Sequence, residues 1–153
     1  MATFYWDTSA LVKRYAQETG TLWVRNLTNP TLNHDIYTVR ITGVEMIAAL
    51  FRKVNTNQIS QHDADLFARD FRLDWQQQYQ IIEVTVNVSE LAMNLAEKHG
   101  LRGYDSVHLA AALVVQDMRQ TMNLQPITFV SADQEQNQAA INEGLFVENP
   151  NHY

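Results

Sequence analysis

The feature that most constrains this fold is a regular alternation of short apolar segments with longer amphipathic ones. The short segments are rich in β-branched and aromatic residues, which favours strands. Strands that alternate with helices along a chain usually form one mainly parallel sheet with helices on both faces. We therefore predict an α/β fold with three layers, α/β/α. The expected strands are residues 3–6, 35–39, 81–84, 127–130 and 145–148.

Between these segments, apolar residues recur at the spacing of an α-helix. Leu109 and Ala112, for example, follow Asp105 at intervals of four and seven residues, which places them on one helical face. Asp105 stands where this helix should begin, and Gly100 should end the preceding helix in a left-handed conformation. The main predicted helices are residues 21–27, 41–55, 60–75, 88–99 and 105–120.

Composition and charge exclude several classes of protein. The chain has 153 residues, 46% of them hydrophobic, which suits one ordinary domain, residues 1–153, with its own core. It has no cysteine, which excludes disulfide scaffolds, thiolate zinc sites and a catalytic cysteine. No apolar run approaches the roughly 20 residues of a bilayer span, so we expect a cytoplasmic protein. The net charge of −6 has the wrong sign for bulk electrostatic binding of nucleic acid, so such a partner must be held locally.

Four of the 17 acidic residues stand at positions that suggest more than a solvated surface. Asp7 and Asp133 follow the first and fourth predicted strands, at the sheet edge where parallel α/β folds bind ligands. Asp105 heads an apolar helical stripe. Glu45 lies on the apolar face of the predicted helix 41–55, where burying it alone would be expensive.

Each of these acids also has a purely structural interpretation. Aspartate is preferred at helix starts, and all three aspartates stand near one. Glu45 lies within a predicted helix and cannot be explained as a helix cap. Its purely structural interpretation is an acid in the core that is protonated or paired with Arg40, Arg52 or a neighbour.

If the four acids lie close together in the fold, they need nearby cations to remain ionised. Like charges at short range repel, and carboxylates with water are the ligands that Mg²⁺ or Mn²⁺ prefers. A divalent ion in such a site lowers the pKa of bound water and neutralises charge on a leaving oxygen. We therefore predict phosphodiester hydrolysis, and we expect that neutralising one acid raises the stability of the metal-free protein.

Several segments carry a resemblance to a known family. They are FYWDTSALVKRY, YTVRITGVEMIAALFRK, LRGYDSVHLAAAL and ITFVSADQEQNQAA followed by EGLFVENP, and they span nearly the whole chain. In this order, the chain resembles the PIN-domain nucleases, and within them the VapC-type toxins of type II toxin–antitoxin modules. The family's acidic quartet falls on Asp7, Glu45, Asp105 and Asp133, and its supporting hydroxyl positions fall on Ser9 and Ser131.

The resemblance implies a PIN-like domain that acts as a Mg²⁺- or Mn²⁺-dependent endoribonuclease on RNA. It implies that the acidic quartet holds the metal and that Ser9 and Ser131 orient acids or water. It also implies a homodimer and a small cognate VapB-like antitoxin, whose C-terminal segment blocks the acidic pocket.

Other interpretations remain open for the chain and for single residues. The alternative function is a catalytically idle PIN-fold module that binds RNA or protein. A haloacid-dehalogenase-type phosphatase is disfavoured, because its second aspartate would fall at position 9, which is Ser9 here.

We interpret His108 as a packed histidine outside the site. Arg40 and Arg102 are the basic residues of most interest for phosphate contacts. A partner groove is an alternative to core packing for Leu66, Phe67, Phe71 and Trp75.

Overall fold

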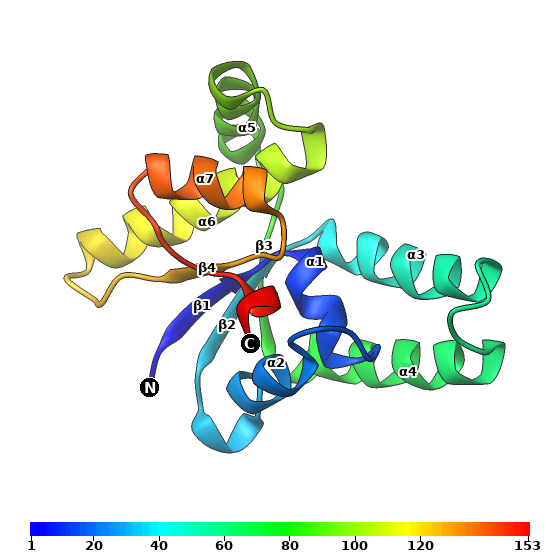
Figure 1. Ribbon diagram of the computed structural model, residues 1–153. Coiled ribbons are helices and arrows are strands. Elements are labelled where there is room, and N and C mark those ends of the chain that lie inside the picture. The colour runs from blue at the N-terminus through cyan, green and yellow to red at the C-terminus, as the bar shows by residue number, and fades with distance from the viewer.

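Five parallel strands form the sheet in the computed structural model, which describes residues 1–153. Their order is β3-β2-β1-β4-β5, so β1 lies at the centre (Figure 1). Every neighbouring pair is parallel, which confirms the predicted architecture. The strands are β1 (Thr3–Trp6), β2 (Asp35–Val39), β3 (Tyr79–Ile82), β4 (Thr128–Val130) and β5 (Phe146–Glu148).

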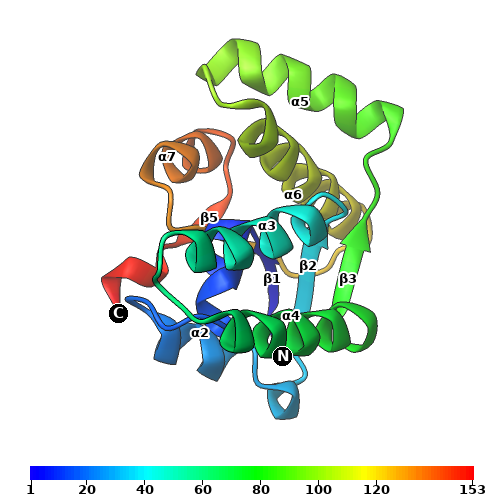
Figure 2. The ribbon, with the colours of Figure 1, turned by 90° about the vertical axis from the view of Figure 1, so that its right-hand side faces the viewer.

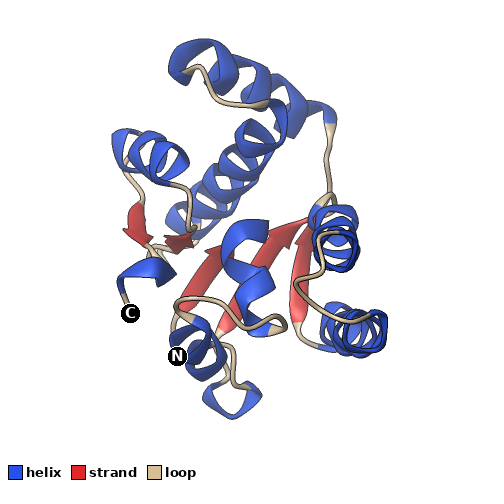
Figure 3. Cartoon of the chain, turned by 45° about the vertical axis from the view of Figure 1, so that its right-hand side comes forward, coloured by secondary structure: helices blue, strands red, loops and turns tan.

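Successive side chains of the central strand point into two different cores. Tyr5 belongs to the core under α5, α6 and α7, whereas Phe4 and Trp6 belong to the core under α1 to α4. Figure 2 shows these two groups of helices apart from each other, and Figure 3 shows helices on both sides of the strands. The three predicted layers are therefore present. The helices are α1 (Thr8–Leu11), α2 (Thr21–Leu27), α3 (Thr42–Asn55), α4 (Gln61–Gln77), α5 (Val86–His99), α6 (Gly103–Thr121) and α7 (Gln134–Asn142).

Capping residues explain where several helices begin and end. The Ser60 and Thr85 side chains accept backbone N–H groups at the starts of α4 and α5. Gly100 ends α5 with a φ of 65°, as predicted. None of the helices combines the length and apolarity needed to cross a bilayer.

Several element boundaries differ from the sequence predictions by one or two residues, and two of these differences affect the core or the site. The third strand was expected at residues 81–84 but begins at Tyr79, which is buried and pairs in register with Ile36. The glutamines around this tyrosine conceal its core position in the sequence. The sixth helix begins at Gly103, so Asp105 lies within its first turn and does not cap it.

The carboxyl ends of β1 and β4 mark the place where the strand order reverses direction. β2 and β3 extend the sheet on one side of β1, and β4 and β5 extend it on the other. Trp6 pairs with Val130, and the N–H of Asp7 donates to the Val130 carbonyl at 3.1 Å. The chain leaves such neighbouring strands in opposite directions, which opens the crevice in which α/β folds bind ligands. Residues 7–9 and 131–133 therefore meet at this edge.

Candidate active site

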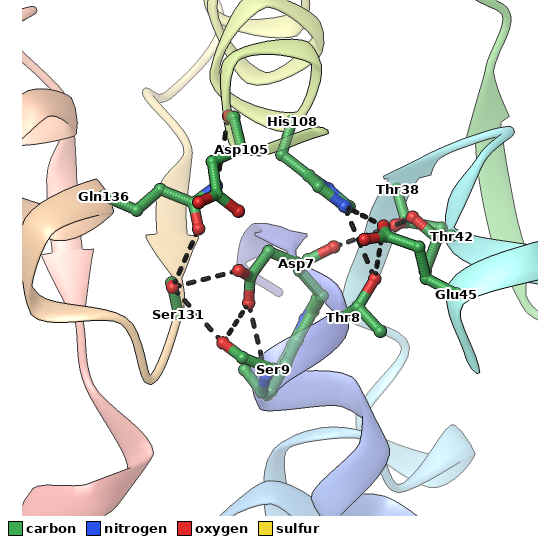
Figure 4. A network of polar contacts seen from close by, with 12 residues as sticks. Asp7, Thr8, Ser9, Thr38, Thr42, Glu45, Asp105, His108, Ser131 and Gln136 are labelled. Carbon is green, nitrogen blue, oxygen red and sulfur yellow. Dashed lines mark hydrogen bonds and ion pairs between the residues drawn. The ribbon is translucent and has the colours of Figure 1, made fainter. Parts of the chain in front are cut away.

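Asp7 is the most tightly held acid at this edge. It directly follows β1, its side chain is 3% exposed, and it caps α1 by accepting the Ala10 N–H at 3.2 Å. The Ser9 hydroxyl donates to Asp7 Oδ1 at 2.7 Å, and the Ser131 hydroxyl donates to Asp7 Oδ2 at 3.0 Å (Figure 4). Both carboxylate oxygens therefore have fixed donors, and Asp7 serves as a helix cap and as a site residue at once.

Burial makes the charge of Asp7 costly. Loss of solvent raises the pKa of Asp7 from 3.8 to about 6, although the electrostatic interaction with His108 and the hydrogen bonds from Ser9, Ala10 and Ser131 act in the opposite direction. The donors around Asp7 orient the carboxylate without fully compensating its charge. A cation in the crevice would supply the missing compensation.

Glu45 reaches the same edge from the first turn of α3. Its Oε1 accepts the Thr8 hydroxyl at 2.8 Å and lies 2.6 Å from His108 Nε2, whereas its Oε2 has no hydrogen-bond partner. Partial burial raises the pKa of Glu45, but the hydrogen bond and the electrostatic interaction with His108 outweigh it, so the net pKa lies below the ordinary value. The partner of this acid is therefore a histidine, and neither Arg40 nor Arg52 pairs with it.

Asp105 faces the site from the first turn of α6 and accepts no side-chain hydrogen bond. Its pKa is raised by burial and then by the charge of Asp133, with a smaller contribution in the same direction from Glu45. These electrostatic effects indicate that the three carboxylates share one region of the protein.

Asp133 caps the last helix, as its structural interpretation predicted. Its Oδ1 accepts the N–H of Gln136 at 3.0 Å, and its own N–H donates to the Ser131 hydroxyl at 3.1 Å. The hydroxyl of Ser131 thus connects Asp133 to Asp7. Ser9 provides a second link between residues 7–9 and residues 131–133, because its hydroxyl accepts the N–H of Ala132 at 2.9 Å.

The carboxylates surround the crevice without forming a closed metal cage. No three His, Asp or Glu side chains are arranged as ligands of one ion. Mg²⁺ is nevertheless often held through only one or two carboxylates, because it keeps several of its waters. The donor chemistry fits such an ion, since the acids offer only oxygen and since the Asp105 carboxylate and Glu45 Oε2 have no protein donor.

A pocket of about 630 Å³ opens beside two of the four acids. Glu45 and Asp105 line it together with Arg52, Arg102 and the 59% exposed ring of Tyr104. Neither arginine forms a salt bridge. Other basic residues of the chain, in contrast, form exposed ion pairs with acids. The pocket thus combines carboxylates, which suit a cation, with free guanidinium groups, which suit a phosphate.

Comparison with known proteins agrees with this arrangement. The sequence matches the PIN domain family over residues 4–142. The chain is a member of the PIN-domain family. Ribonuclease VapC45 of Mycobacterium tuberculosis (strain CDC 1551 / Oshkosh) is 32% identical to it over 117 residues, which cover 76% of this chain and 79% of the relative.

Solved structures share the PIN-domain fold. FitAcB from Neisseria gonorrhoeae has a TM-score of 0.59 at 15% identity, covering 98% of this chain and 99% of that one. VapBC2 from Rickettsia felis, solved with a DNA fragment from its promoter, has a TM-score of 0.59 at 16% identity, covering 96% and 98%. This PIN-domain chain is therefore a distant relative of the VapC ribonucleases, as the resemblance of its sequence predicted.

Sequence reasoning missed two side chains of this PIN-domain site. His108 is buried and hydrogen-bonded, as predicted, and its partner is Glu45, a contact that the sequence did not indicate. Its position three residues after Asp105, on the same side of one helix, was the available signal. The hydroxyl of Thr8 also binds Glu45, and its place directly after Asp7 gave a similar hint.

The two arginines singled out in the sequence have different environments. Arg102 lines the acidic pocket, as expected for a phosphate contact. Arg40 instead forms an exposed ion pair with Glu83 and lies over the ring of Trp75. Arg52, which the sequence suggested as a partner of Glu45, lines the pocket together with Arg102.

Proposed function

We propose that this PIN-domain protein is a Mg²⁺- or Mn²⁺-dependent endoribonuclease of the VapC type, with residues 1–153 acting as one catalytic domain. The observation that carries the proposal is the pocket in which Glu45 and Asp105 present unpaired oxygens beside two unpaired arginines. The relationship to VapC45, whose name describes a ribonuclease, supports RNA as the substrate.

Each acid has a distinct part in this proposal. Asp7, Glu45 and Asp105 would hold the ion directly or through water, and Asp133 would complete the anionic cluster. When bound, the ion supplies an acidified water and neutralises charge on the phosphate. Ser9 keeps Asp7 in one orientation, with a second hydroxyl on the opposite carboxylate oxygen.

The pocket offers contacts for the RNA on both sides of the acids. Arg52 and Arg102 would bind phosphates bidentately and so draw RNA to an otherwise acidic chain. The exposed ring of Tyr104 would stack on an unpaired base next to the cleaved bond. In-line hydrolysis would leave a 5′-phosphate on one fragment and a 3′-hydroxyl on the other.

We further propose a homodimer that a VapB-like antitoxin neutralises. The relative solved as VapBC2 supports such a partner. A second cavity, of about 550 Å³, is lined by Phe71 and Trp75 and shares Val44 and Ala48 with the acidic pocket. An antitoxin segment seated there would continue directly onto the acids and block the entry of RNA.

Cleavage of single-stranded RNA tests the proposed function. The wild-type protein should cut RNA with Mg²⁺ or Mn²⁺, lose activity in EDTA and yield 5′-phosphate ends. Asp7→Asn should abolish cleavage, whereas Asp63→Asn, on the exposed first turn of α4, should not affect it. A folded wild-type protein that binds RNA without metal-dependent cleavage would instead support the idle binding module.

A further inference from the structure

His108 is a buried imidazole whose two nitrogens both have polar partners. The residue is 1% exposed and lies on the inner face of α6. Its Nε2 lies 2.6 Å from Glu45 Oε1, and its Nδ1 lies 3.0 Å from the hydroxyl oxygen of Tyr5. The histidine thus links a tyrosine of the central strand to an acid of the pocket.

The partners determine how the protons are arranged. An ionised carboxylate only accepts hydrogen bonds, so the proton between His108 and Glu45 resides on Nε2. Tyr5 is completely buried, and its hydroxyl has no hydrogen-bond partner other than Nδ1. Tyr5 can therefore donate its proton to Nδ1, which leaves the ring proton on Nε2, facing Glu45.

The tyrosine has little freedom to move. Its ring stacks on Phe129 with a centroid distance of 5.6 Å and an interplanar angle of 6°, and it meets the edge of His108 at 6.0 Å and 78°. A rigid strand residue therefore fixes the imidazole, and the imidazole in turn fixes Glu45.

Both donors to Glu45 bind the same oxygen. The Thr8 hydroxyl and His108 Nε2 meet Oε1, and no protein group donates to Oε2. Resting on the function proposed above, we propose that Tyr5 and His108 are a positioning pair that fixes Glu45 through Oε1 and leaves Oε2 as the oxygen offered to metal and substrate. The pair acts through Glu45 and does not itself touch the RNA.

A spectroscopic measurement tests the proton arrangement without metal or substrate. Long-range ¹H–¹⁵N NMR of the wild-type protein should show His108 with a proton on Nε2 and with Nδ1 accepting a hydrogen bond. In Tyr5→Phe, Nδ1 should lose the signature of that hydrogen bond. A wild-type ring without a proton on Nε2 would overturn the proposal, whether or not the protein cleaves RNA.

Metal binding tests the consequence for the site. Titration with Mn²⁺, followed by electron paramagnetic resonance, should show about 10- to 100-fold weaker binding for Tyr5→Phe and for His108→Leu, the usual effect of losing a partner of a metal ligand. His108→Gln, whose amide can still donate to Glu45, should recover most of the affinity. Tyr15→Phe is the matched control, because it loses a buried hydroxyl bonded to Asp74 in the opposite core.

The variants separate positioning from packing. If His108→Leu and His108→Gln fold and bind Mn²⁺ equally well, or if Tyr15→Phe weakens binding as much as Tyr5→Phe does, the positioning role is wrong. In a cleavage assay at saturating metal, kcat should fall while KM stays within about twofold. A wild-type protein that binds Mn²⁺ but does not cleave RNA would refute the proposed function and leave the comparison of metal affinities intact.

Discussion

Replacing Asp7 by asparagine should stabilise the metal-free protein at neutral pH while removing its activity. Asparagine has nearly the same shape, and its Oδ1 can still accept the Ser9 hydroxyl and the Ala10 N–H. The amide group that replaces Oδ2 faces the Ser131 hydroxyl, which must then accept instead of donate. The substitution therefore removes the buried charge and disturbs one hydrogen bond.

The magnitude follows from the pKa of Asp7. Its rise from 3.8 to about 6 means that ionisation destabilises the folded protein by about 3 kcal/mol at pH 7. The disturbed hydrogen bond costs about 1 kcal/mol, so Asp7→Asn should gain about 2 kcal/mol. For a domain of this size, this corresponds to about 4–8 °C in Tm.

The sign of the pH dependence is specific. Because the folded pKa of Asp7 lies above the unfolded one, the folded state retains this proton between pH 4 and pH 6, where the unfolded state has released it. The stability contributed by the protonated group is therefore present at low pH and is lost as the pH rises to about 6. Asparagine has no such dependence, so its advantage should be about 2 kcal/mol at pH 7 and should vanish near pH 4.

Urea denaturation of both proteins in EDTA, at several pH values from 4 to 7, measures this difference. Asp63→Asn serves as the control, because this exposed acid in the first turn of α4 interacts favourably with the helix dipole and its loss should not stabilise the protein. An Asp7→Asn protein that is no more stable than wild type at pH 7, or an advantage that does not change with pH, would refute the reasoning.

Three further substitutions test other parts of the structure. Glu45→Gln should lower cleavage about 100-fold or more, because several kcal/mol of transition-state stabilisation by the metal would be lost. It should lower the urea midpoint at neutral pH, because the lowered pKa of Glu45 means that its ionised form stabilises the folded protein. Ser131→Ala removes the donor to one oxygen of Asp7 and should lower the free energy of unfolding by about 1–3 kcal/mol. Gly20→Ala should cost about 2–3 kcal/mol in urea denaturation, because Gly20 has a φ of 85° and an added Cβ would lie 2.1 Å from the Pro150 carbonyl oxygen.

The sequence predicts most of the fold because the strands are short, apolar and separated by periodic helices. The fully buried strand β1 and the left-handed cap at Gly100 follow from local chemistry alone. The register of β3 does not follow from local chemistry, because the core position of Tyr79 depends on neighbours that are distant in the sequence. Arg14 donates to its hydroxyl at 2.9 Å, and Ile36 pairs with it in the sheet.

The candidate site is partly predictable for a similar reason. Strand ends place Asp7 and Ser131 at one edge of a parallel sheet, and this position can be read from the sequence. The link between Glu45 and His108 cannot be read from the sequence, because 63 residues separate them and their helices pack on different cores. Only the folded arrangement of α3 and α6 around the sheet decides whether the two side chains touch. A buried histidine on the apolar face of a helix gives the same sequence pattern whether its hydrogen-bond partner is a backbone carbonyl or an acid of the site.

The pairing of β1 with β4 also affects when the candidate site is assembled during synthesis of the chain. Asp7 and the Ser131 hydroxyl that orients it are 124 positions apart, so the first emerges from the ribosome long before the second. In a nascent chain, Oδ2 of Asp7 has no donor until β4 has docked beside β1. Chains on the ribosome should therefore lack the complete site until residues 128–131 have emerged and folded.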